Sequence, residues 1–216
     1  MKQKSILHSL LFPFWAVGIL KLETILLDPF VDWAKGLSFP LLTAVLCLLA
    51  KILCLAIPVA FLESEQECRL KLRFPPPSFW KGGWIAVFIP MSILGIAIPL
   101  AFRGFRISLM KDAFVAPNSL FAGVVMLLWA VVLPAILEEW LFRREILFWL
   151  RPYGRAKAIL FSALLFGVVH ASFPQMLSAS VGGLFLGVAA LRWGVGASMF
   201  LHGMYNLLNL LISWIW

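Results

Sequence analysis

Charged residues are scarce in this chain. They make up 13% of its 216 residues, whereas hydrophobic residues make up 62%. This composition excludes a soluble domain of this size and predicts a polytopic helical membrane protein. The net charge of +8 does not indicate a nucleic-acid partner, because the basic residues lie mostly in short loops between apolar runs, where they orient a chain in a bilayer.

Cysteine is nearly absent too. The three cysteines form no C-x-x-C pair, and Cys47 and Cys54 are seven apart on one apolar segment, which is typical of helix packing. No H-E-x-x-H motif for a zinc protease is present, and no serine or cysteine stands in an obvious nucleophile position. The amino terminus has Lys2 and Lys4 before an apolar run but no A-x-A cleavage site, so we expect a retained first helix.

Apolar runs divide the chain into six to seven membrane spans. We expect an all-α, polytopic transmembrane helical bundle with spans at 6–27, 39–62, 82–102, 119–150, 157–171, 176–191 and 195–216. The first span is interrupted by Pro13, the fourth should be broken or bent near Pro134, and Phe173-Pro174 should form a turn. Twelve Lys and Arg residues on the side of the amino terminus against four on the other predict a cytoplasmic amino terminus.

Two adjacent carboxylates, Glu138 and Glu139, stand in the apolar run of the fourth span. A charge in mid-membrane costs roughly 2.5–3.5 kcal/mol, so an acidic pair there indicates function. On a helix, Glu139 lies one turn before Arg143 and can pair with it, while Glu138 points about 100° away and stays available as a general base. The alternative is a helix end at the headgroups, with both acids solvated beside Arg144 and Glu145.

Two of the three histidines fall in late apolar helices. Around the turn at Gly154, Glu138 is 16 residues back and His170 is 16 residues on, so a hairpin would place them at similar depth. His202 and Asn206 are four apart on one helix face and could donate to a single oxygen. A carboxylate and an imidazole that activate water, with two donors facing an oxyanion, are the equipment for hydrolysing an amide. Each histidine alone could equally be a helix-packing residue.

At this point the residues resemble a known family. Glu138-Glu139-x-x-x-Arg143, Phe166-x-x-x-His170 and His202-x-x-x-Asn206 are similar, in the same order, to the three motifs of the CPBP family of intramembrane proteases, which includes the CAAX-prenyl endopeptidases. The resemblance covers residues 119–216, which we expect to be a catalytic helical core. Residues 1–118 are expected to be transmembrane helices without a recognised motif.

The resemblance implies an intramembrane endopeptidase in a bacterial inner membrane, with a site open toward the cytoplasm. It implies that Glu138 is the general base, that His170 holds or activates the water, and that His202 and Asn206 stabilise the oxyanion, with Glu139 and Arg143 as structural support. Family members have been described both as metalloproteases and as glutamate proteases. A zinc site of two histidines and a glutamate stays the alternative, but the pairing of His202 with Asn206 favours an oxyanion hole and no metal.

The implied partners are membrane lipids and a membrane-anchored or lipidated substrate cut near its carboxyl terminus. The short loops offer no separate prenyl-binding domain, which favours a bacterial sorting tail or peptide precursor. Two other functions stay open: a non-catalytic immunity or scaffold protein, against which the full motif set argues, and a small proton-coupled transporter that uses Glu138 and His170 as a relay. The absence of paired repeats argues against the transporter.

Overall fold

The computed structural model describes residues 72–102, 120–170 and 172–215, with short pieces at 17–18, 45–46, 49–50 and 52–53. The three cysteines, His8, Asn118 and Ser119 lie outside the described residues, as do nearly all of the two spans expected at 6–27 and 39–62. The chain divides into two compact units, Met1–Cys68 and Arg69–Trp216. The second unit contains every described motif residue.

The described part of this second unit is helical throughout its regular structure and contains no strand, which confirms the all-α prediction. Its α-helices are α3 (Trp84–Ala101), α4 (Leu120–Leu127), α5 (Leu133–Glu139), α6 (Leu147–Leu150), α7 (Arg155–Val168), α8 (Phe173–Trp193) and α9 (Val195–Ile215). Short π-helical segments at Leu128–Val132 and Trp140–Ile146 and a 3-10 turn at Arg151–Tyr153 complete the set. Before α3, Phe79–Gly83 contains a kink, where the backbone of Lys81 and Gly82 is not helical.

Four of the described helical stretches are long and apolar enough to cross a membrane: Phe79–Ala101, Gly123–Tyr153, Phe173–Trp193 and Val195–Ser213. The chain is therefore an integral membrane protein. The expected helix at 157–171 is α7, whose 14 residues span about 21 Å, less than the thickness of a bilayer core. The expected total of six to seven spans stays a prediction.

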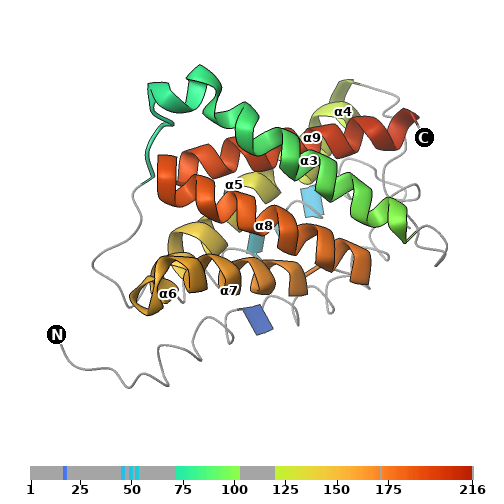
Figure 1. Cartoon of the computed structure of the whole chain (residues 1–216). Helices are drawn as coiled ribbons and strands as arrows, with labels where there is room; N and C mark the ends of the chain where they lie inside the picture. The colour runs from blue at the N-terminus through green and yellow to red at the C-terminus, as the bar shows by residue number, and fades with distance from the viewer. Residues whose placement is uncertain are drawn as a thin grey trace. The chain divides into compact units, whose positions relative to one another are not determined.

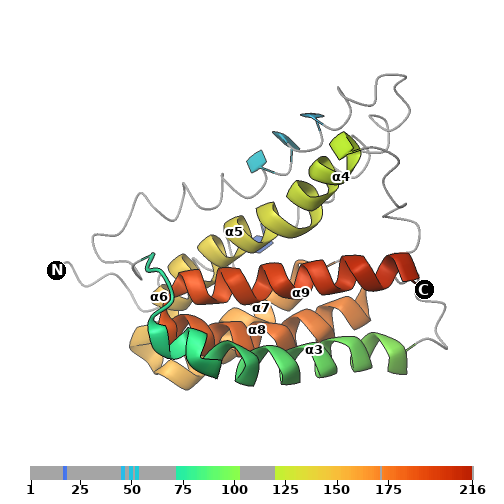
Figure 2. The ribbon, with the colours of Figure 1, turned by 90° about the horizontal axis from the view of Figure 1, so that it is seen from above.

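Helix α8 is the central element of the described bundle. It packs between α3 and α7, as Figure 1 shows, and α9 lies against α8, α5 and α3. Seen from above in Figure 2, the continuous run from α4 to α6 passes beside α9. Of the motif-bearing helices, α5 packs against α9, and the π-helical segment Trp140–Ile146 that follows α5 packs against both α7 and α9. Helix α3, which carries no motif, belongs to the same unit.

Close packing of α8 on α7 depends on small side chains. A Cβ on Gly183 would stand 3.0 Å from the Ala163 Cα, and one on Gly187 would stand 3.1 Å from Ile159. Within a membrane there is little hydrophobic drive between helices, so close approach of backbones through small residues is the main source of helix association. The close approach of α8 fixes the position of α7, and with it the position of the segment that leads to His170.

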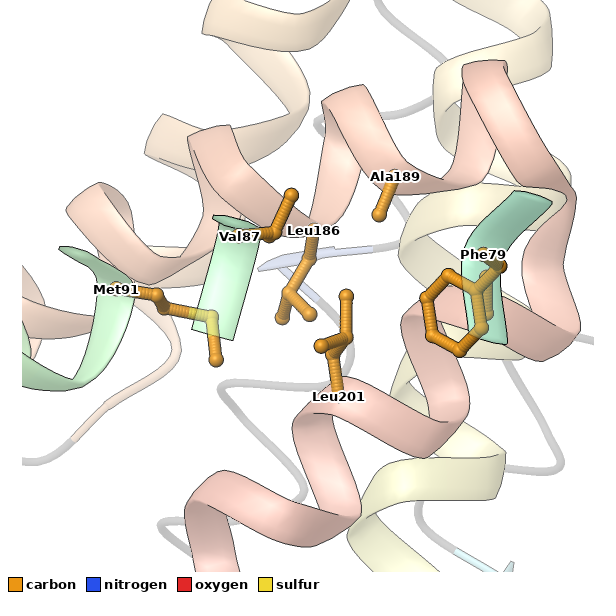
Figure 3. Close-up of a cluster of buried hydrophobic side chains, with 7 residues drawn as sticks. Phe79, Val87, Met91, Leu186, Ala189 and Leu201 are labelled. Carbon is orange, nitrogen blue, oxygen red and sulfur yellow. The ribbon is translucent and has the colours of Figure 1, made fainter. Parts of the chain in front are cut away.

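A cluster of buried side chains joins α3, α8 and α9 near the start of α9. Figure 3 shows Val87 and Met91 of α3 meeting Leu186 and Ala189 of α8 and Leu201 of α9, with Phe79 at one end. All of these side chains are at most 8% exposed. The cluster anchors α9 at the residue directly before His202, and so sets the rotation of the helix at the site.

Prolines alter these helices locally without ending them. Pro134 has no N–H for the carbonyl of Ala130, and the preceding turn widens into the π-helical segment Leu128–Val132, so the helix continues where a break or bend was expected. Pro174 lies in the first turn of α8, where no N–H is needed. The turn expected at Phe173-Pro174 is therefore the beginning of a helix.

Pro99 creates a similar vacancy in α3, where the carbonyl of Gly95 loses its usual donor. The hydroxyl of Ser178 on α8 donates to this carbonyl at 2.8 Å. The hydroxyl of Tyr205 on α9 lies 3.4 Å from that of Ser178, and a Cβ at Gly95 would collide with the Tyr205 ring. The carbonyl of Gly95, which Pro99 leaves without its donor, thus forms a polar contact between α3 and α8 with Ser178.

We predict that Gly167→Ala destabilises the protein. The added methyl group would collide with Ser180 Oγ and stand 2.5 Å from the Met176 carbonyl oxygen, so α7 and α8 must move apart, at a cost of about 1–3 kcal/mol. Gly182→Ala is the control, because nothing lies within 4 Å of that position and alanine favours a helix. Thermal unfolding in detergent checks this, and equal midpoints for the two variants would contradict close packing of α7 on α8 at Gly167.

Candidate active site

The candidate site is formed where α5, α7 and α9 meet. Helix α5 ends with Glu138 and Glu139, and α9 brings His202. Gly203 of α9 faces Ala135 of α5, and a Cβ on this glycine would stand 3.5 Å from the Ala135 Cβ, at ordinary van der Waals distance. The side chain of Glu139 is fully buried and that of His202 is 7% exposed, so a polar cluster is enclosed within apolar helices.

Glu139 and Arg143 form a buried ion pair. The Nε atom of Arg143 lies 3.2 Å from Oε2 of Glu139, and both side chains have no exposed surface. The spacing of four residues predicts this contact, and the structure confirms it. The alternative in which both acids are solvated at a helix end is wrong for Glu139.

His202 lies between the two glutamates, a contact that the sequence does not predict. Its Nδ1 is 3.1 Å from Oε1 of Glu139, and its Nε2 is 3.9 Å from Oε2 of Glu138. Since a carboxylate only accepts, Nδ1 carries a proton that it donates to Glu139. Glu139 thus contacts Arg143 with one oxygen and His202 with the other, while Glu138, 18% exposed, is the carboxylate that reaches the surface of the cluster.

The second motif meets the first and the third through Phe166. The Phe166 ring contacts the ring of His202 at 5.7 Å and that of His170 at 5.0 Å, both edge to face. The guanidinium carbon of Arg143 lies 4.8 Å from the Phe166 centroid, a cation–π distance. The two histidines are therefore gathered at one ring. The similar depth of Glu138 and His170 expected from the hairpin at Gly154 stays a prediction.

His170 stands just beyond the end of α7 and is half-buried. Its Nδ1 lies 2.9 Å from the carbonyl oxygen of Phe166, which accepts the Nδ1 proton. In the neutral ring, Nε2 is then the acceptor atom. The helix end thus fixes which nitrogen of His170 is able to accept a proton from water.

Asn206 lies one turn after His202 on α9 and is half-buried. Its amide forms no hydrogen bond with the part of the chain that the structure describes. The spacing of four residues places it on the same helix face as His202, as the sequence predicts. The amide is therefore a donor still available to a ligand.

Ser162 is a member of this network that the motifs do not include. Its hydroxyl, on α7, donates to the carbonyl of Phe142 at 2.8 Å and accepts from Nη1 of Arg143 at 3.2 Å. The residue is 1% exposed. A serine in the apolar run before His170 is a weak signal in sequence, because small polar residues are common where membrane helices pack.

Comparison with known proteins agrees with this geometry. Residues 118–208 match the family model described as type II CAAX prenyl endopeptidase Rce1-like. Residues 118–208 are therefore similar to this family, and we call them the Rce1-like segment. The match confirms the resemblance carried by the three motifs. Neither the curated proteins nor the solved structures gave a match to the chain.

The donor set of the Rce1-like segment does not suit zinc in this arrangement. Among the described residues, no three His, Cys, Asp or Glu side chains lie close enough together to hold a metal ion. Nδ1 of His202 contacts Glu139 and Nδ1 of His170 contacts a backbone carbonyl, so a metal could be bound by these rings only through Nε2. A zinc site normally takes three or four protein ligands, so we derive no chemistry through a metal here.

We predict that Arg143→Leu destabilises the Rce1-like segment by about 3–5 kcal/mol, because it leaves the carboxylate of Glu139 buried without its cation. The double variant Glu139→Leu with Arg143→Leu should recover most of this loss, since it buries no charge at that pair. Unfolding in detergent measures both.

Arg155→Leu, which changes an exposed arginine, is the control for the removal of a positive charge. An Arg143→Leu protein as stable as the Arg155→Leu protein would show that the ion pair contributes nothing to stability.

Proposed function

We propose that this protein hydrolyses a peptide bond near the carboxyl terminus of a membrane-anchored or lipidated substrate, using water activated by Glu138. The observation that supports this most directly is the difference in environment between the two adjacent acids. Glu139 is buried and held by Arg143, whereas Glu138 has no such cation and is 18% exposed. An enclosed cluster with one accessible carboxylate is suited to general-base catalysis.

In the proposed first step, Glu138 takes a proton from water, and the oxygen of that water bonds to the carbonyl carbon of the scissile amide. In this proposal His170 accepts a hydrogen bond from the same water through Nε2, because its Nδ1 is committed to the Phe166 carbonyl. The carbonyl oxygen becomes an oxyanion. The oxyanion then re-forms the carbonyl bond as the carbon–nitrogen bond breaks, and Glu138 returns its proton to the leaving amine. The second proton of the water stays on the attacking oxygen, so that the products are a carboxylic acid and an amine.

The oxyanion is stabilised by donors from α9 in this proposal. Nδ1 of His202 is used by Glu139, so Nε2 is the nitrogen that faces the reaction, and it donates when the ring carries both protons. Asn206, one turn along the same face, supplies an amide donor. Removing one such donor typically lowers turnover by about 10²–10³-fold in hydrolytic enzymes.

Charge balance favours the same assignment. With His202 protonated, the cluster contains two cations, Arg143 and His202, and two anions, Glu138 and Glu139. A balanced cluster limits the cost of enclosing charge among apolar helices. When Glu138 accepts a proton from water, the negative charge that it loses appears on the substrate oxygen, next to Nε2 of His202.

Glu138→Gln should abolish cleavage and leave the midpoint of thermal unfolding unchanged. Glutamine keeps the shape of the side chain but cannot take a proton from water. The probe is a quenched peptide whose farnesylated cysteine precedes three further residues, together with the same peptide without the lipid, added to purified protein in nanodiscs.

The possible results of this experiment distinguish a glutamate-dependent protease from a scaffold protein. Full cleavage by the Glu138→Gln protein would remove the glutamate mechanism, and no cleavage of either peptide by the wild type would count against the protease assignment for CAAX-type tails. A Glu138→Gln strain that keeps the cellular phenotype without cleavage would favour a scaffold.

A metal-independent reaction should survive chelation. We expect 1,10-phenanthroline at a concentration that strips zinc from a control metalloprotease to leave turnover of the peptide unchanged, since the described residues offer no three-ligand metal site. Loss of turnover, with recovery when zinc is added back, would replace the proposed mechanism with a metal-dependent one.

A further inference from the structure

The bonding of the Ser162 hydroxyl is fixed in direction. A serine hydroxyl has one proton and two lone pairs, and a carbonyl oxygen only accepts. The Ser162 proton must therefore go to the Phe142 carbonyl, at 2.8 Å, and a lone pair receives Nη1 of Arg143, at 3.2 Å. Ser162 of α7 thus contacts the π-helical segment Trp140–Ile146 twice: it donates to the backbone carbonyl of Phe142 and accepts from the side chain of Arg143.

The guanidinium of Arg143 is held in three places. Nε faces Glu139, Nη1 faces Ser162, and the face of the group lies over Phe166. Nε and Nη2 have no hydrogen-bond partner in the part of the chain that the structure describes, so Nε meets Glu139 as an ion pair and the hydrogen bond of the guanidinium described there is the one from Nη1 to the Ser162 hydroxyl. Because the guanidinium is planar, contacts at two of its nitrogens determine its rotation.

Glu139 links the orientation of the guanidinium to that of the His202 imidazole, because it contacts both groups. One oxygen of Glu139 lies 3.2 Å from Arg143 and the other lies 3.1 Å from Nδ1 of His202, so a rotation of the arginine turns the carboxylate that holds the imidazole. His202 then presents Nε2 toward Glu138, 3.9 Å away. Four buried side chains thus form one chain of contacts from α7 to α9.

We propose that Ser162 is a positioning residue for the hydrolysis: through Arg143 and Glu139 it fixes the imidazole of His202 with Nε2 toward the reacting oxygen. This inference rests on the proposed function. Ser162 itself touches neither substrate nor water in the proposed reaction. Its removal should therefore lower turnover without weakening substrate binding.

Ser162→Ala is expected to lower kcat about tenfold with little change in KM. The guanidinium keeps Glu139 but loses the contact that sets its rotation, and a misplacement of about 1 Å in a catalytic group is sufficient for losses up to about 10²-fold. Ser162→Thr, which keeps the hydroxyl, should restore most of the lost turnover. Rates are measured with the farnesylated quenched peptide on the purified full-length protein in nanodiscs.

Ser178→Ala is a closely matched control. Its hydroxyl also donates from one helix to a backbone carbonyl of another, at 2.8 Å, but contacts no arginine. Both alanine variants should lose similar thermal stability, while the fall in kcat should be confined to Ser162→Ala. Equal kcat in the Ser162→Ala and wild-type proteins, or equal losses in the two alanine variants, would overturn the proposal.

A measurement without substrate separates this inference from the proposed function. In histidine-labelled protein, the ¹⁵N signal of His202 Nδ1, assigned by its loss in His202→Gln, reports the hydrogen bond to Glu139. It should shift in Ser162→Ala and stay in place in Ser178→Ala. If the His202 signal shifts in Ser162→Ala but the wild-type protein cleaves no peptide, the positioning role stands and the proposed protease function is wrong. If the signal does not move in Ser162→Ala, the positioning role is wrong, whether or not the protein cleaves the peptide.

Discussion

Enclosing a charge among membrane helices requires that the charge be compensated, and this constraint organises the candidate site. Arg143 compensates Glu139, and the two side chains are completely buried. Because a buried ion pair tolerates the loss of neither partner, the end of α5 and the π-helical segment after it are held in a fixed relation. His202 and Ser162 then add one hydrogen bond to each member of the pair from two further helices. The site is thus also the place where α5, α7 and α9 are joined.

The local part of this site could be predicted from sequence. Glu139 and Arg143 are one turn apart on one helix, so their contact follows from spacing alone. The contact of Glu139 with His202 joins residues 63 apart and depends on where Ala135 and Gly203 let α5 and α9 meet, which no pattern in the chain specifies. The sequence thus predicts Glu139 and Arg143 together as structural support, whereas the contact of Glu139 with the imidazole depends on how the helices pack.

The described helices follow hydrophobic runs closely, and the differences arise at prolines. The run alone locates α3, α8 and α9, because a membrane helix must satisfy its backbone internally and continues as long as the sequence stays apolar. Pro134 and Pro174 are read from sequence as breaks, yet a widened turn accommodates one and the first turn of α8 the other. The short α7 and the residues outside the described part leave the number of spans open.

The π-helical segments on both sides of the acidic pair have a consequence for how this sequence can vary. A π-helical turn holds one residue more than an α-helical turn, so shortening Leu128–Val132 by a single residue would restore regular winding. The residues after it would keep their angular position relative to α4, because the shorter turn still completes one rotation. The same deletion in the regular winding of α5, before the acidic pair, would instead rotate Glu138 and Glu139 by about 100° relative to α4, away from the junction with α9. The π-helical segment is therefore the place in this helix where the sequence can lose one residue without turning the acidic pair away from the site.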